Sequence, residues 1–142
     1  MKEQLPIFVY GTLRPRGSNY YIIESWVRDV QSAEMAGLQL WNLGPYPMAC
    51  EGVGRVRGEL LTLERTCHKE ALARIDQLEG VDPATPTRPG RINYWRARRI
   101  ALLPAAGAPH PEAWVYLGDI KHARQGTRIL TGDWWEAANP TR

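Results

Sequence analysis

Cysteine is scarce in this sequence, and its arrangement excludes the common zinc motifs. Cys50 and Cys67 are the only two, no CxxC pair is present, and the three histidines show no ligand spacing with them. We therefore expect no structural metal. The two thiols could still form one disulfide, but the opening residues MKEQLPIF lack the charged and apolar regions of a signal peptide. That absence favours free thiols in a reducing, cytoplasmic compartment.

Long apolar runs and several familiar catalytic motifs are also missing. No run approaches the roughly 18 residues that cross a bilayer, so we expect no membrane partner. The phosphate-binding pattern GxxxxGK followed by Ser or Thr, the zinc-protease pattern HExxH and the serine-hydrolase pattern GxSxG are all absent. These absences set aside nucleotide-binding, metalloprotease and serine-hydrolase functions.

The sequence has little excess of charge of one sign. The formal net charge is +3 with an isoelectric point near 9.1, and 15 of the 18 basic residues are arginines spread along the chain. Only Arg96, Arg98 and Arg99 form a tight group, and a solvated strand face accounts for them. Six tryptophans invite a base-stacking interpretation, but buried tryptophan is the commoner case, so we expect no nucleic-acid partner.

What the sequence does contain is the composition of an ordinary globular protein. Its 142 residues, 44% hydrophobic and 23% charged, suit one domain over residues 1–142 with a packed core. The apolar run at residues 6–10 ends at Gly11 and predicts a buried strand followed by a loop. Ser18 can then cap a helix, which we predict to follow it and to cover the strand. Five apolar residues follow it at helical spacing: Ile22, Ile23, Trp26, Val27 and Val30.

The middle of the chain predicts two strands and an amphipathic helix. The strands cover residues 35–43 and 53–63, with a rigid Gly-Pro-Tyr-Pro stretch between them. Thr66 can cap the helix with Glu70 near the capping-box position, and Gly80 ends it. The apolar face of this helix carries Ala71, Leu72, Ile75 and Leu78.

The last third of the chain predicts a loop and two further strands. Residues 82–91 (DPATPTRPGR) are rich in proline and polar side chains, and we expect an exposed loop. The strands follow at residues 94–103 and 113–117, joined by the flexible segment PAAGAPHP. Five strands, few helices and long irregular connections predict an α+β fold built on a curved or closed sheet rather than on alternating βαβ units.

One carboxylate stands out on the predicted helix. Glu79 follows Ile75 by four residues and lies beside the apolar stripe, in the last turn, where the helix dipole disfavours negative charge. Both effects raise the pKa of a carboxyl group toward the range of a general base. A glutamate that swings into water as the helix ends fits the same pattern, and the local sequence alone favours that simpler interpretation. Asp76, nearer the rim of the stripe, is a weaker candidate for the same role.

The loop after the first strand, residues 10–14 (YGTLR), is the second candidate for chemistry. Gly11 lets the backbone approach a ligand, and successive N–H groups can form a nest for a carboxylate or an oxyanion. Arg14 adds a bidentate contact to a carboxylate in this interpretation, although an exposed arginine at such a position is usually solvated. Because strand, glycine and threonine are also common turn chemistry, the loop alone does not identify a site.

Five segments together carry a family resemblance. They are FVYGTLRPRGSN at 8–19, IDQLEGV at 75–81, YWRARRIAL from 94, AWVYLGD at 113–119 and TGDW at 131–134. In order and spacing, across nearly the whole chain, they resemble the γ-glutamylcyclotransferase-like family and especially its small γ-glutamylamine cyclotransferase-like members. The resemblance implies a small mixed β-barrel flanked by helices, with the YGTL loop and Glu79 meeting in one cavity.

The resemblance also implies roles for individual residues. Glu79 would be the catalytic acid and base. The residues implied as contacts to a small γ-glutamyl substrate are Tyr10, Gly11, Thr12, Leu13, Arg14, Tyr94 and Tyr116. In the implied reaction the α-amine of a γ-glutamyl conjugate attacks its own γ-carbonyl, releasing 5-oxoproline and a free amine or amino acid. This reaction needs no metal and no cofactor.

Two alternatives stay open at this point. A noncatalytic small-molecule-binding domain could retain the same cavity without turnover. The long segment between Gly80 and Tyr94 could be a lid over the cavity or only a surface loop. The residues that select the leaving amine lie in loops outside the shared segments.

Overall fold

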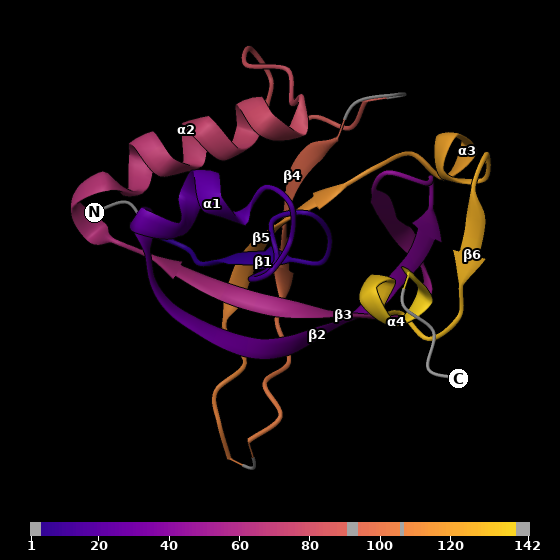
Figure 1. Ribbon diagram of the computed structural model, residues 1–142, viewed down its shortest axis with the longest axis horizontal. Helices are drawn as coiled ribbons and strands as arrows, with labels where there is room; N and C mark the ends of the chain where they lie inside the picture. Colours follow the sequence, from indigo (N-terminus) through magenta and orange to yellow (C-terminus); the bar gives the residue numbers. More distant parts are fainter. Residues whose placement is uncertain (1–3, 91–93, 106, 139–142) are drawn as a thin grey trace.

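A curled mixed sheet with helices against it makes up the computed structural model, which describes residues 4–90, 94–105 and 107–138 (Figure 1). The strands are β1 (Ile7–Val9), β2 (Val27–Asn42), β3 (Pro47–Leu63), β4 (Trp95–Ile100), β5 (Glu112–Leu117) and β6 (Thr127–Ile129). The helices are α1 (Tyr20–Ile23), α2 (His68–Glu79), α3 (Ile120–Ala123) and α4 (Trp134–Ala138). The six strands of this described part are ordered β4-β5-β1-β3-β2-β6, and they confirm the predicted α+β class, with the sheet curled into a half-barrel.

The long hairpin of β2 and β3 forms most of the curl. The two strands pair antiparallel from Val27 opposite Leu63 to Asn42 opposite Pro47. The register shifts between Ala36 and Leu38, where Gly37 has a φ of 77°. A bulge of this kind bends a strand and increases its twist, so the hairpin wraps around the core instead of lying flat.

Strand β1 is buried on both faces and divides the core. It pairs antiparallel with β3 and parallel with β5, while Ala49 of β3 also pairs with Leu117 of β5. Phe8 belongs to the cluster inside the curl, whereas Ile7 and Val9 belong to the cluster under α2. Because side chains alternate across a strand, this explains why the predicted strand is a continuous apolar run.

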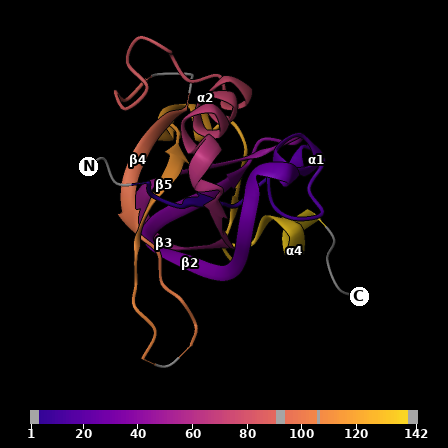
Figure 2. The same ribbon diagram turned by 90° about the vertical axis from the view of Figure 1, so that its left-hand side faces the viewer.

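Helix α2 covers the outer face of the sheet, and Figure 2 shows it nearly end-on above the strands. Two residues of its inner face, Ala71 and Ile75, are fully buried against the sheet. Gly80 follows the helix with a φ of 72°, a left-handed conformation that glycine adopts readily, and its N–H bonds back to Asp76 and Gln77 carbonyls. The predicted helix end is therefore confirmed.

The predicted helix after Ser18 is much shorter than expected. Helix α1 ends at Ile23, a 3-10 turn covers Glu24–Trp26, and β2 has begun by Val27. The apolar spacing that favoured a longer helix also suits a strand, and pairing of Val30 with Leu61 of β3 decides between them. The cap residue is Asn19 and not Ser18, and its side chain makes no cap hydrogen bond.

Two further predictions about helices and strands need correction. Thr66 lies inside a 3-10 turn, Arg65–Cys67, and α2 begins at His68 without a side-chain cap. The third predicted strand starts earlier, at Pro47, because β2 offers it partners along its whole length. Strand β6 was not predicted; it has only three residues and is held by antiparallel pairing to β2.

The structure agrees with the predictions about the loop at 82–91, the two thiols and the lack of a long apolar segment, for the residues it describes. Residues 82–90 are mostly exposed, as expected, and the carbonyl of Pro86 accepts a hydrogen bond from the N–H of Arg96 at 2.9 Å. Residue 91, which ends the predicted loop, lies outside the described residues. Cys50 and Cys67 are free thiols, which confirms that prediction. Among the helices described, none has the length and apolarity needed to cross a membrane.

Candidate active site

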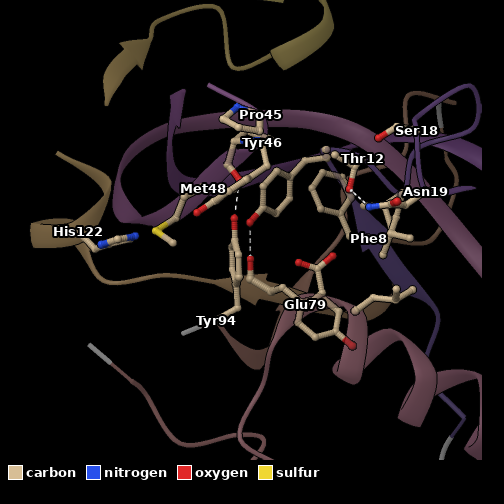
Figure 3. A pocket seen from close by; sticks show the side chains of 17 residues that line it. Phe8, Thr12, Ser18, Asn19, Pro45, Tyr46, Met48, Glu79, Tyr94 and His122 are labelled. Carbon is tan, nitrogen blue, oxygen red and sulfur yellow. Dashed lines mark hydrogen bonds between the residues drawn. The ribbon is translucent and has the colours of Figure 1, made fainter. Parts of the chain in front are cut away.

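A cavity of about 440 Å³ opens where β1 ends (Figure 3). Its walls come from the loop after β1, the turn between β2 and β3, the end of α2 and the strand β5. Every predicted site residue except Arg14 lines it: Tyr10, Gly11, Thr12, Leu13, Glu79, Tyr94 and Tyr116. The YGTL loop and Glu79 therefore lie in one cavity although about 65 residues separate them in sequence.

Glu79 is the carboxyl group of this cavity. It is the last residue of α2, and its side chain points into the cavity between Tyr94 and Phe8 (Figure 3). Burial and, to a smaller extent, the nearby carboxylate of Asp76 together raise the pKa of Glu79 from 4.5 to about 7. The predicted rise is confirmed, so this group can both accept and give a proton near neutral pH.

Asp76, the weaker candidate for the same role, does not line the cavity. Its Oδ1 atom accepts a hydrogen bond from Arg96 Nε at 2.7 Å and another from the hydroxyl of Tyr116 at 2.6 Å. A carboxylate that is held by a guanidinium and a phenol is poorly placed to take a proton from a ligand. We therefore exclude Asp76 as the base and assign to it the negative charge that acts on Glu79.

Three tyrosines form the wall of the cavity around Glu79. The hydroxyl of Tyr10 donates to the carbonyl of Tyr116 at 2.5 Å and accepts from the N–H of Ala49 at 3.2 Å. The hydroxyl of Tyr94 donates to the carbonyl of Pro47 at 2.6 Å. Burial raises the pKa of Tyr10, Tyr94 and Tyr116 above the usual range of a phenol, so all three are neutral. Their hydroxyls are bonded within the protein, and they shape the cavity instead of supplying a charge.

The residues of the YGTL loop line the cavity and carry backbone donors. Among the described residues, the N–H groups of Gly11, Thr12 and Leu13 have no hydrogen-bond acceptor, whereas the next N–H, of Arg14, bonds to the Gly11 carbonyl at 3.1 Å. A Cβ atom on Gly11 would lie 2.9 Å from the ring of Pro47, so this backbone approaches the start of β3 too closely for a side chain. Successive free N–H groups of this kind can hold an anionic oxygen.

Arg14 was predicted to contact a substrate carboxylate, and the structure corrects this. Its buried guanidinium makes a bidentate pair with Glu59, at 2.7 and 2.8 Å, and donates to Asp133 at 3.0 Å. The ring of Trp135 lies 3.9 Å from its Cζ atom. The donors of the guanidinium are thus occupied by carboxylates of the protein, and Arg14 does not line the cavity.

Several lining residues were not predicted. They are Phe8, Val9, Ser18, Asn19, Pro45, Tyr46, Pro47, Met48, Leu78 and His122. Ser18 and Asn19 belong to the same sequence segment as the YGTL loop, so their place in that segment was an available signal. No local pattern marks His122, because α3 reaches the cavity only through the way the chain folds after β5.

Two further predictions concern ligands and the loop at 82–93. No described residue of the segment 82–90 lines the cavity, which favours a surface loop over a lid; residues 91–93 lie outside the described part. In the described ranges, no group of three His, Cys, Asp or Glu side chains is arranged to hold a metal ion.

Comparison with known proteins identifies the family. The chain belongs to the family described as gamma-glutamyl cyclotransferase, AIG2-like, whose model matches residues 7–136. It is 30% identical over 132 residues to the gamma-glutamylcyclotransferase family protein YtfP of Escherichia coli K12, a match that covers 90% of this chain and 94% of the relative. The predicted family resemblance is confirmed.

Solved structures agree on the fold. An uncharacterized protein from Pyrococcus horikoshii superimposes with a TM-score of 0.64 at 19% identity, over 94% of this chain and 92% of its own. An AIG2-like protein from Mus musculus superimposes with a TM-score of 0.60 at 20% identity, over 80% of this chain and 76% of its own. At such identities the likeness concerns the fold alone.

Proposed function

We propose that this protein is a cyclotransferase that releases 5-oxoproline and a free amine or amino acid from a γ-glutamyl conjugate. The observation that carries the proposal is that Glu79, whose pKa is about 7, lines the same cavity as Gly11, Thr12 and Leu13, whose N–H groups have no acceptor among the described residues. A proton acceptor and an oxyanion site are the two groups that an intramolecular acyl transfer needs. Membership of the gamma-glutamyl cyclotransferase, AIG2-like family supports the γ-glutamyl substrate.

The proposed reaction begins with a proton transfer. The deprotonated carboxylate of Glu79 takes a proton from the α-ammonium group of the substrate, and the freed amine attacks the γ-carbonyl carbon of the same molecule. The new C–N bond closes a five-membered ring and places a negative charge on the former carbonyl oxygen. Because both reacting groups belong to one molecule, positioning supplies much of the rate, and one base is enough.

The second half of the reaction breaks the original amide bond. Glu79 gives its proton to the departing nitrogen as the C–N bond of the conjugate breaks and the carbonyl re-forms. The carboxylate then takes the second proton from the cationic ring nitrogen and passes it to the released amine or to water, so 5-oxoproline leaves as a lactam with one N–H and Glu79 is a carboxylate again. The N–H groups of Gly11, Thr12 and Leu13 are the proposed donors to the oxyanion, and each such donor is worth about 3 kcal/mol in comparable enzymes. No step needs a metal or a cofactor. Because both cysteines are free thiols, we also propose that the protein resides in a reducing compartment such as the cytoplasm.

A substrate panel tests the proposal. Purified protein is incubated with γ-glutamyl amines, γ-glutamyl dipeptides and glutathione, and 5-oxoproline is quantified. We expect Glu79→Gln to lower the rate by about 10²- to 10⁴-fold, the usual contribution of general acid–base catalysis. Glu70→Gln is the matched control, because Glu70 is exposed in the first turn of the same helix and away from the cavity.

The outcomes separate the candidate functions. Turnover that Glu79→Gln leaves undiminished would contradict the mechanism. If no conjugate gives 5-oxoproline but one of them binds saturably, the protein is a noncatalytic small-molecule-binding domain that retains the cavity.

A further inference from the structure

Thr12 and Asn19 face each other at one end of the cavity. The Nδ2 atom of Asn19 donates a hydrogen bond to Oγ1 of Thr12 at 3.0 Å (Figure 3). Both residues line the cavity, one from the YGTL loop and the other from the start of α1. This side-chain bond has no part in the mechanism proposed above.

The side chain of Asn19 is not used to cap the helix. Asn19 occupies the N-cap position of α1, where an asparagine side chain commonly accepts a hydrogen bond from a helix N–H group. Here it makes no cap bond. The amide is directed at Thr12 instead, so its orientation serves the cavity and not the helix.

The bond decides what the hydroxyl of Thr12 can offer. A threonine hydroxyl has one proton to donate and two lone pairs that accept. Asn19 occupies a lone pair, and among the described residues no acceptor is found for the proton of Thr12. An amide donor therefore keeps the hydroxyl proton available to a ligand in the cavity.

The backbone holds this pair in place independently of the two side chains. The N–H of Asn19 donates to the carbonyl of Thr12 at 2.9 Å, and the N–H of Gly17 donates to the carbonyl of Arg14 at 2.6 Å. A Cβ atom on Gly17 would lie 2.3 Å from the carbonyl oxygen of Thr12, so only glycine allows this close packing. Substituting the Asn19 side chain leaves the backbone bond available.

We propose that Asn19 is a positioning residue that orients the Thr12 hydroxyl as a hydrogen-bond donor to an oxygen atom of the bound γ-glutamyl group. The inference rests on the proposed function and adds to it a side-chain donor beside the three loop N–H groups. Asn19 acts through Thr12, and Thr12 touches the substrate.

A double-mutant cycle tests this assignment. We expect Asn19→Ala and Thr12→Val each to lower kcat/KM by up to about tenfold, the value of one hydrogen bond, and the double variant to be no worse than Thr12→Val alone. Thr12→Ser keeps the hydroxyl and is expected to retain most of the activity. Thermal unfolding of each variant shows whether the fold is intact.

The matched control is Ser18→Ala, a neighbouring cavity residue with no side-chain bond to Thr12 among those described. Its effect is expected to add to that of Thr12→Val. If the losses from Asn19→Ala and Thr12→Val also add, Asn19 does not act through Thr12 and the inference is wrong. Wild-type protein that forms no 5-oxoproline from any conjugate defeats the proposed function itself, whereas turnover with additive losses defeats this inference alone.

Discussion

The two sides of the loop at residues 10–19 differ in whether their polar groups have hydrogen-bond partners within the protein. On the cavity side, three N–H groups have no acceptor among the described residues, and Glu79 lies in an apolar and aromatic setting that raises its pKa. On the other side, the guanidinium of Arg14 is satisfied by Glu59, Asp133 and the ring of Trp135. The polar groups that find partners within the protein, on what we call the matched side, hold the loop in place. Those without a partner, on the unmatched side that faces the cavity, are available to a ligand.

The largest effect on stability is expected on the matched side. Arg14→Met removes the guanidinium and leaves the carboxylates of Glu59 and Asp133 without the cation that both of them contact. Losing one partner of a buried pair costs about 3–5 kcal/mol. Urea unfolding, followed by tryptophan fluorescence, measures the change in the free energy of unfolding.

An exposed ion pair supplies the control for that measurement. Glu112 pairs with Arg98 at 3.1 Å, and both side chains are nearly half exposed. Because surface pairs contribute about 0–1 kcal/mol, Glu112→Gln should barely change the unfolding midpoint. Equal losses in Arg14→Met and Glu112→Gln would show that the cluster around Arg14 is not a special anchor of the loop.

On the unmatched side, removing the negative charge of Glu79 should stabilise the protein. The pKa of Glu79 is 4.5 in the unfolded chain and about 7 in the folded one, so above pH 7 folding must bury a carboxylate that the cavity disfavours. The penalty is absent below pH 4.5, grows between pH 4.5 and 7, and is complete above that, at about 3 kcal/mol. We expect Glu79→Gln to raise the unfolding temperature at pH 8 and to have little effect at pH 4.

A gain that is the same at both pH values would mean that Glu79 does not titrate as described. Glu70→Gln, on the exposed side of the same helix, is the control for removing a carboxylate that is not buried. A gain confined to high pH would show that the protein retains an unfavourable carboxylate, as expected of a catalytic group.

The smallest expected effect concerns the influence of Asp76, a carboxylate with partners in the protein, on the pKa of Glu79 in the cavity. Asp76 is held by Arg96 and Tyr116, yet its charge raises the pKa of Glu79. Asp76→Asn removes that charge, so the pKa of Glu79 falls. The rising limb of the kcat/KM profile should move to lower pH by less than about one unit. A limb that stays in place, or moves upward, would contradict the coupling; Glu112→Gln serves again as the control.

Local sequence predicted the parts of the fold whose cause is local. The end of α2 at Gly80 and the buried strand β1 follow from spacing, capping and burial along one segment. The same helix geometry gave a reason for a raised pKa at Glu79 without establishing that its side chain is buried. The family resemblance then brought the YGTL loop and Glu79 together. Without it, a glutamate that turns into water was the simpler interpretation.

The predictions that failed depend on partners distant in sequence. Val27 and Val30 fit a helix as well as a strand, and only the pairing of β2 with β3 separates the two. Arg14 looked like a ligand contact because its partners, Glu59 and Asp133, lie 45 and 119 residues away. The Asn19 side chain escaped notice because its bond to Thr12 depends on a loop conformation that no spacing reveals.

The hydroxyl of Tyr10 has a consequence for how this protein folds. It joins the end of β1 to the N–H of Ala49 in β3 and to the carbonyl of Tyr116 in β5, across 39 and 106 residues. Bringing such distant segments together costs chain entropy, and folds rich in contacts of this kind form slowly. The cavity wall therefore depends on β5: a chain that lacks β5 lacks Tyr116, and with it both a lining residue and the acceptor of the Tyr10 hydroxyl.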